Sequence, residues 1–148
     1  MSTITQEGHI VTGTTPYGLG VTVALSYDAA VARVRDALAA EGFGVLTEID
    51  VAATLKKKLD VDRPPYVILG ACNPSLAHQA LQLETDIGLL LPCNVIVYAT
   101  DNPERTVVAA LDPEAALQLT GRTDIAPLAT EVKARLRRAL EAVARPAT

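Results

Sequence analysis

Two cysteines and a histidine, the side chains best suited to bind a soft metal or react with a small molecule, gather in the middle third of this chain. They are Cys72, His78 and Cys93. Each cysteine precedes an asparagine, Asn73 or Asn94, and lies beside an apolar run. This pattern predicts that the reactive side chains sit at the ends of core elements, where a binding or catalytic site can form.

Cys72 lies where an apolar run, residues 66–71, meets the signals for a helix N-terminus. Asn73 is a favourable N-cap, and Pro74 suits the first helical position. Unpaired backbone N–H groups and the helix dipole favour a thiolate or a bound anion, so the pattern predicts a lowered thiol pKa. A structural alternative stays open, in which Cys72 is a small apolar core residue beside an ordinary cap.

His78 lies on the second turn of the same predicted helix, and its helical phase favours exposure to solvent. Cys93 begins a later predicted strand, which would lie near Cys72 if it paired antiparallel with residues 66–71. Two thiols and an imidazole would suit Cu(I) or Zn(II). The spacing C-x5-H-x14-C matches no compact zinc motif, and a redox pair of the CxxC type is absent.

Two carboxylates, Glu48 and Asp50, share one face of a predicted strand by alternation. Such a pair can perform acid–base catalysis. It can equally be a solvated face, or pair with the lysines at 56–58, so we assign it a supporting role beside Asn73 and Asn94. The motifs GxxxxGK[ST], GxGxxG, HExxH and GxSxG do not occur, which weakens nucleotide-dependent, zinc-protease and α/β-hydrolase hypotheses.

The composition fits one domain over residues 1–148 with an aliphatic core. A net charge of −4 and only four tyrosines and one phenylalanine argue against a nucleic-acid partner. The basic cluster at 133–138 fits a solvated helix face, with an acidic partner as the alternative. No apolar run reaches membrane-spanning length and no signal peptide pattern begins the chain, so we expect a cytoplasmic protein without a membrane partner.

Hydrophobic periodicity and turn signals predict the elements that position these residues. The expected order is strand and helix three times, then a hairpin, then two helices. It predicts an α+β fold: a two-layer α/β sandwich with a mixed or mainly antiparallel sheet and helices packed on one face. A doubly wound parallel sheet is the alternative. The predicted strands are 19–25, 43–50, 66–71, 93–100 and 105–111, the predicted helices begin near 26, 51, 74, 113 and 124, the last ends near 144, and residues 1–15 are frayed or an edge strand.

Three sequence blocks resemble the bacterial and archaeal family of unknown function called DUF302. They are GFGVLTEIDV at 42–51, RPPYVILGACNPSLAHQAL at 63–81 and GLLLPCNVIVY at 88–98. The resemblance spans about residues 19–120. It implies a small cytoplasmic α+β domain that forms a homodimer, and it implies no established activity. The family's characteristic polar residues fall on Glu48, Asp50, Cys72, Asn73, Pro74, His78, Cys93 and Asn94.

Three hypotheses for function follow from the sequence. The first is a module in which Cys72, Cys93 and His78 bind Cu(I), Zn(II) or a small thiol-reactive ligand. The second is a structural or interaction role for a homodimer whose cysteines are core residues. The third is an enzyme that uses Cys72 as a nucleophile activated by the helix N-terminus. The residues favour the binding module narrowly and name no substrate.

Overall fold

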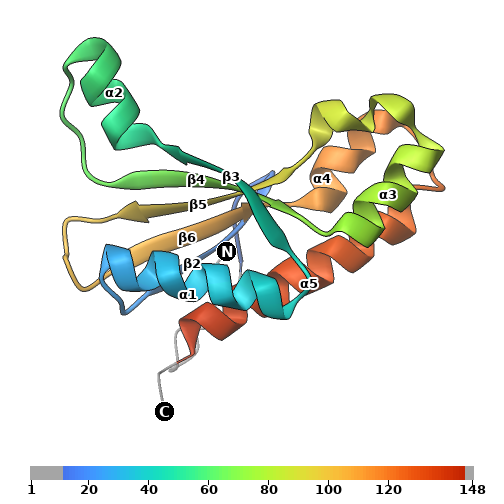
Figure 1. The fold of residues 1–148 in the computed structure, drawn as a ribbon. Coiled ribbons are helices and arrows are strands. Elements are labelled where there is room, and N and C mark those ends of the chain that lie inside the picture. The colour runs from blue at the N-terminus through green and yellow to red at the C-terminus, as the bar shows by residue number, and fades with distance from the viewer. Residues whose placement is uncertain (1–11, 146–148) are drawn as a thin grey trace.

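A computed structural model describes residues 12–145 of the chain. A single sheet carries one helical layer, and smaller helices lie at both of its ends (Figure 1). The elements are β1 (Thr12–Thr15), β2 (Gly18–Val23), α1 (Tyr27–Ala40), β3 (Gly44–Asp50), α2 (Val51–Leu59), β4 (Tyr66–Cys72), α3 (Pro74–Leu83), the 3₁₀ helix η1 (Thr85–Leu90), β5 (Cys93–Ala99), β6 (Thr106–Leu111), α4 (Pro113–Leu117), the 3₁₀ helix η2 (Gln118–Thr120) and α5 (Ala126–Ala144).

The sheet has the strand order β1-β2-β6-β5-β4-β3, and every neighbouring pair is antiparallel. The predicted α+β fold with an antiparallel sheet is confirmed, and the parallel alternative is wrong. The reason lies in the connections: α2 links neighbouring strands β3 and β4 at one end of the sheet, and α3 with η1 link β4 and β5 at the other (Figure 1). Neither connection crosses the face of the sheet, as a parallel pair would require.

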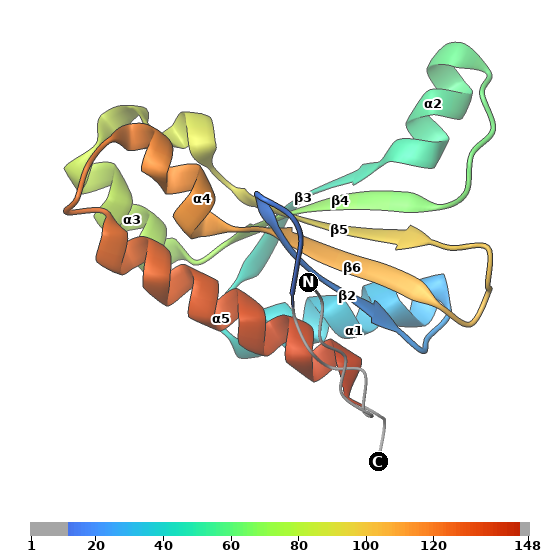
Figure 2. The same cartoon turned by 180° about the vertical axis from the view of Figure 1, so that it is seen from behind.

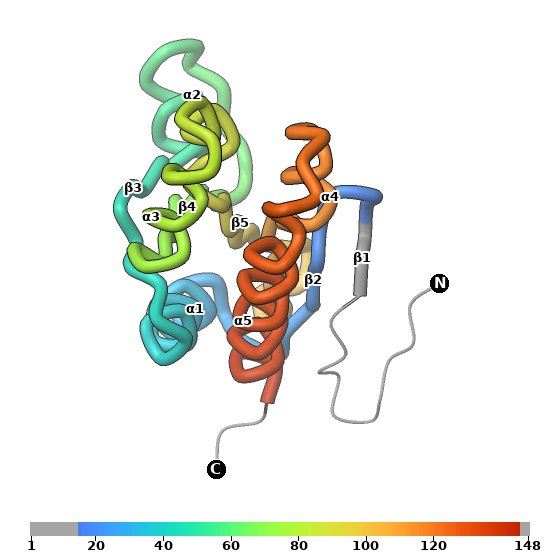
Figure 3. Tube along the Cα trace, turned by 90° about the vertical axis from the view of Figure 1, so that its right-hand side faces the viewer, coloured from blue at the N-terminus to red at the C-terminus, as the bar shows by residue number. Residues whose placement is uncertain are grey.

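Helices α1 and α5 form the layer that covers one face of the sheet, as Figure 2 shows from behind. The end-on view shows the same two helices next to each other, with α2 on the other side of the molecule (Figure 3). Residues 1–11 lie outside the described residues, whereas Thr12–Thr15, the end of the segment expected to be frayed or an edge strand, form the edge strand β1. No helix within residues 12–145 is long and apolar enough to cross a membrane.

Capping residues place the helix ends as their sequence signals predict. The Ser26 hydroxyl accepts a hydrogen bond from the Ala29 N–H, with 3.3 Å between N and O, and begins α1. The helix ends at Ala40, and Gly42 follows with a φ of +85°, a left-handed conformation that glycine adopts without steric penalty. The Phe43 N–H then donates to the Leu38 carbonyl at 2.9 Å, which completes the cap. This tight turn directs β3 back along the sheet.

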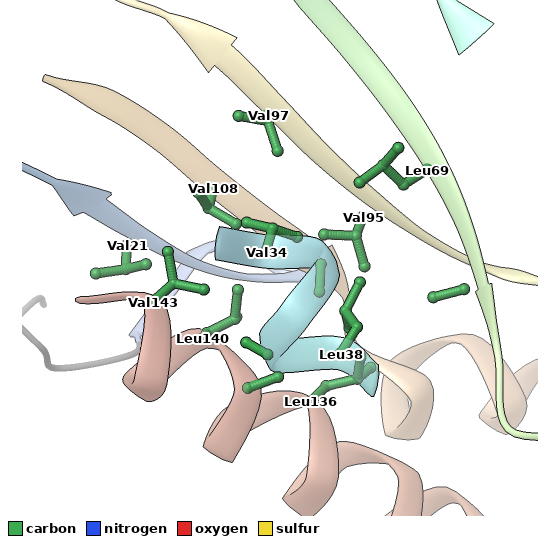
Figure 4. Packing of buried hydrophobic residues seen from close by; sticks show 14 of the residues in the cluster. Val21, Val34, Leu38, Leu69, Val95, Val97, Val108, Leu136, Leu140 and Val143 are labelled. Carbon is green, nitrogen blue, oxygen red and sulfur yellow. The ribbon is translucent and has the colours of Figure 1, made fainter. Parts of the chain in front are cut away.

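The main core lies between the sheet and α1 with α5, and it is aliphatic as predicted. Alternate residues of the central strands point into it, while Leu38 of α1 and Leu136 of α5 meet them from the other side (Figure 4). A smaller second core joins α3, η1, α4 and α5. Its buried members are Ala80, Ile87, Leu117, Ile125 and Ala129.

The environment of the apolar run over residues 66–71 differs from the one its sequence predicts. A continuous run of this kind indicates a strand buried on both faces. In the structure β4 alternates instead: Val67, Leu69 and Ala71 are buried under the helices, whereas Tyr66 and Ile68 remain partly exposed on the other face. The sheet therefore has one covered face and one uncovered face that is also apolar.

Candidate functional site

The two cysteines lie next to each other at one end of the sheet. Cys72 is the last residue of β4 and Cys93 is the first residue of β5. The register pairs Ala71 directly with Cys93, so the two cysteines are diagonal neighbours on adjacent antiparallel strands. The predicted proximity of the two positions follows from this pairing, and both thiols are free.

Both cysteines line one apolar cavity between this sheet end and the smaller core. Helix α3 and η1 form one side of the cavity, and α4 with α5 form another. The cavity volume is about 40 Å³, which is room for only a few water molecules. Apolar side chains that line it include Phe43, Leu76, Ile87, Leu117, Leu128 and Val132. The lining is therefore suited to a small apolar group, with two sulfur atoms as its most reactive components.

The predicted lowering of the Cys72 pKa is wrong. Burial raises the pKa of the Cys72 thiol above its ordinary value, and it raises that of Cys93 to about 11, with a smaller increase from a charge on Cys72. The apolar walls disfavour a thiolate, and this effect outweighs the nearby helix N-terminus. The Asn73 side chain also satisfies one of the backbone N–H groups at the start of α3, because its Oδ1 accepts from the Leu76 N–H at 3.2 Å.

His78 lies on α3 as predicted, and its side chain is exposed. It does not line the cavity that Cys72 and Cys93 share. Within residues 12–145, no group of three or more His, Cys, Asp or Glu side chains is arranged to bind a metal ion. The structure thus brings the two cysteines together but does not add His78 to them, because the helix turns its imidazole toward solvent.

The supporting carboxylates lie away from the cavity and have structural partners. Glu48 forms an ion pair with Arg35 of α1 instead of the lysines at 56–58. Asp50 caps α2, since its Oδ1 accepts from the Ala53 N–H at 2.8 Å. Both residues oppose buried residues of β4, which keeps them on the helix-covered side of the sheet, as alternation predicts.

The supporting asparagines occupy two different environments. Asn73 lines the cavity and caps α3. Asn94 is exposed on β5 and borders two hollows on the uncovered side of the sheet instead. Sequence reasoning placed both beside the cysteines, but successive residues of a strand point to opposite faces. Asn94 therefore turns away from the cavity that Cys93 lines.

The far wall of the cavity was not predicted from the sequence. Ile87, Leu90 and Leu91 belong to an apolar run that is too short for a membrane span and for which no helix or strand was predicted. In the structure this run forms η1 and the approach to β5. The sequence did contain one signal for such a wall: this apolar run fits neither the alternation of a strand nor the length of a long helix.

Comparisons with known proteins agree with this fold. The family described as "Domain of unknown function DUF302" matches residues 19–143, which extends the expected span of 19–120 through most of α5. No curated protein matches the chain. A crystal structure of an uncharacterised conserved DUF302 protein from Bacillus stearothermophilus is similar, with a TM-score of 0.79 and 28% identity over 85% of this chain and 97% of that one. The chain therefore belongs to the DUF302 family.

Proposed function

We propose that this domain binds a small, apolar, thiol-reactive ligand in the cavity lined by Cys72 and Cys93. The observation that carries the proposal is that both cysteines of the chain line the same apolar cavity. Concave apolar sites with a few polar or reactive groups are the usual form of small-molecule sites. Cys72 is partly exposed and Cys93 is buried, so an incoming ligand meets Cys72 first.

The size and chemistry of the cavity define the ligand class. A volume of about 40 Å³ admits an apolar group of a few heavy atoms without rearrangement of the walls. The raised pKa values keep both thiols protonated at neutral pH. A site of this kind selects for apolar reagents over charged ones, because desolvating a charge in such walls is unfavourable.

Alkylation rates test this selectivity. We would compare N-ethylmaleimide with a sulfonate-bearing maleimide on the reduced protein, and locate the adduct on Cys72 by mass spectrometry. With either reagent the S–H group adds across the maleimide C=C bond: sulfur bonds to one carbon, the proton goes to the other, and nothing is released. The fraction of thiolate affects both rates equally, so it cancels when one rate is divided by the other. We expect the protein to favour the apolar reagent about tenfold more than free cysteine does, as for a difference of roughly 1.4 kcal/mol.

A pair of variants distinguishes binding in the cavity from general reactivity. Ala77 lines the cavity, so Ala77→Leu fills it. Gln79 is exposed on the same helix, so Gln79→Leu makes the same kind of change outside it. We expect Ala77→Leu to reduce the rate ratio to that of free cysteine and Gln79→Leu to retain it. A wild-type ratio equal to that of free cysteine would refute the proposal.

A second candidate is a Cu(I) site made by the two sulfur atoms alone. Its support is that Cys72 lies close enough to Cys93 for its charge to raise the neighbouring pKa. Sulfur ligands select Cu(I), whereas structural Zn(II) needs four ligands. Native mass spectrometry of reduced protein with Cu(I) tests it. One copper per chain that is lost in Cys72→Ser supports the site, and equal copper retention by that variant argues against it.

The remaining hypotheses receive different support from the geometry. The burial of Cys93 favours a structural role for at least that thiol. Nucleophilic catalysis by Cys72 loses its main argument, because a raised pKa lowers the fraction of thiolate at neutral pH. An unselective, slow reaction of both thiols with the two maleimides would favour the structural role.

A further inference from the structure

The cysteine cavity shares one wall with a larger hollow on the molecular surface, which we call the outer hollow. The outer hollow lies between η1 and α4 with η2, at the end of the sheet away from α2 (Figures 1 and 2). Its volume is about 400 Å³, against about 40 Å³ for the cysteine cavity. The residues that line both spaces form the shared wall: Leu90, Leu91, Pro92, Leu111 and Ala116.

The shared wall is one layer of side chains thick. Each of its five residues lines the cysteine cavity as well as the outer hollow, and each is partly exposed instead of buried. Leu90 ends η1 and Leu91 follows it, and the hydrogen bonds of a 3₁₀ helix have poorer geometry than those of an α-helix. Partly solvated side chains can move aside with less loss of packing than Ile87 and Leu117, the buried residues elsewhere around the cavity. The shared wall is therefore the part of the cavity that admits a ligand most easily.

Cys72 lies on the same side of the sheet as the outer hollow. Gly70 of β4 pairs directly with Asn94 of β5, so these two positions share one face. Cys72 lies two residues after Gly70 and is on that face too, because side chains alternate along a strand. Asn94 lines the outer hollow, whereas its neighbour Cys93 is buried on the other side. A molecule that enters through the shared wall thus meets Cys72 before Cys93.

The outer hollow is apolar and uncharged. Among the described residues, no Asp, Glu, Lys or Arg lines it, and Tyr17 and Asn94 supply its polar side chains. Leu89 and Leu119 stand at its rim with exposed fractions of 88% and 78%. Exposed leucines beside a concave apolar surface are typical of a site for an apolar ligand.

The part of the cavity near Phe43 and Asn73 has a different character. It adjoins the turn at Gly42, where an added Cβ would lie 2.9 Å from Asn73 Nδ2 and 3.4 Å from Arg135 Nη1. The Arg135 guanidinium donates to the Glu41 carbonyl at 3.1 Å. An apolar molecule that approached here would partly desolvate a charged group, which favours the route through the shared wall.

We propose, on the basis of the function proposed above, that the ligand is an elongated molecule whose reactive end reaches Cys72 and whose apolar tail occupies the outer hollow. The cysteine cavity alone holds only a few heavy atoms. The outer hollow has room for a tail of roughly ten, at about 30 Å³ each as for a molecule of liquid water. Its volume lies within the range of about 300–1,000 Å³ that is typical of small-molecule sites. For a ligand with an electron-poor C=C bond, the Cys72 sulfur bonds to one carbon and the thiol proton goes to the other, so the addition needs no co-reactant.

Alkylation of the reduced protein by N-ethylmaleimide and N-hexylmaleimide tests for the tail site. The two reagents share the reactive ring and differ by four methylene groups, and mass spectrometry locates each adduct on Cys72. Each fully buried methylene strengthens binding about fourfold. Burial of two of the four predicts that the protein favours the hexyl reagent at least about tenfold more than free cysteine does, at reagent concentrations below saturation.

Two variants place the tail in the outer hollow. Ala115 lines the outer hollow but not the cysteine cavity, so Ala115→Leu fills the hollow alone. Ala29→Leu makes the same change at an exposed position of α1 and is the control. We expect Ala115→Leu to abolish the preference for the hexyl reagent and Ala29→Leu to retain it. Leu89→Asp, which places a carboxylate at the exposed rim, should lower this preference at least about threefold and decides the case in which Ala115→Leu does not fold.

Comparison with the sulfonate-bearing maleimide separates a failure of the tail site from a failure of the proposed function. A wild-type protein that selects N-ethylmaleimide over the sulfonate-bearing reagent but shows no preference for the hexyl tail overturns the tail site alone. A preference for the tail that folded Ala115→Leu protein retains also overturns it, because the tail then lies elsewhere. Loss of the selectivity against the sulfonate refutes the proposed function, and the tail site with it.

Discussion

Raising the pH should destabilise this protein through Cys93, by an amount that follows from its burial. The pKa of Cys93 rises from the ordinary 9.0 to about 11 in the folded chain, first because of burial and then because of the charge on Cys72. The unfolded chain therefore loses this proton at lower pH than the folded chain. The stability that the buried, protonated Cys93 thiol contributes is fully present below pH 9 and is lost as the pH rises toward 11.

The magnitude follows from the two ionisation equilibria. At pH 10 the unfolded thiol is mostly ionised and the folded thiol is mostly protonated, so Cys93 alone should remove about 1.4 kcal/mol of stability relative to pH 7. Cys72 and Tyr27 change stability in the same direction, since burial raises the pKa of each of them too. A variant that lacks only the Cys93 thiol separates the contribution of Cys93 from theirs.

Urea unfolding of wild type and Cys93→Ala, under reducing conditions at pH 7 and pH 10, measures this quantity. The variant has its own constant penalty from lost packing, which cancels when each protein is compared with itself. We expect the wild type to lose about 1 to 1.5 kcal/mol more than Cys93→Ala between the two pH values. Equal losses would refute the claim that apolar walls surround Cys93, and with it the proposed cavity.

Two further predictions concern the elements that build the cavity. Gly70→Ala should destabilise the fold by about 1–3 kcal/mol, because an added Cβ would collide with Thr47 and overpack the sheet; Gly44→Ala is the control, since nothing lies within 4 Å of its added Cβ. Thermal unfolding compares them, and equal midpoints would contradict the packing argument. Asn73→Ala should remove the α3 cap and lower the free energy of unfolding by about 1 kcal/mol, whereas Asn94→Ala at an exposed strand position should lower it less. Urea unfolding compares the two variants, and a lower midpoint for Asn94→Ala than for Asn73→Ala would show that the cap is unimportant.

Local patterns in the sequence predicted most elements because each pattern reports on its immediate neighbours. Ser26, Asn73 and Gly42 set helix ends through hydrogen bonds or a backbone conformation within a few residues. The antiparallel hairpin of β5 and β6 likewise follows from a short turn. The limits of α5 were predicted within two residues for the same reason.

The sign of the Cys72 pKa shift could not be obtained in this way. The helix N-terminus is a local feature and is visible in the sequence, but the desolvating walls come from segments up to some sixty residues away, such as Leu128 and Val132. Which of the two effects prevails depends on how closely these segments approach the thiol. That approach exists only in the folded chain.

The order of strands and helices, the aliphatic core, the family and the placement of both cysteines at strand ends could all be predicted from the residues alone. These properties depend on periodicity, composition and short blocks of residues. Two features came from the packing of the folded chain and could not be predicted. The cysteines share a cavity while His78 and Asn94 turn away from it, and one face of the sheet, with Ile68 and Ile96, stays uncovered. Burial depends on contacts between distant segments, and residue order alone does not specify those contacts.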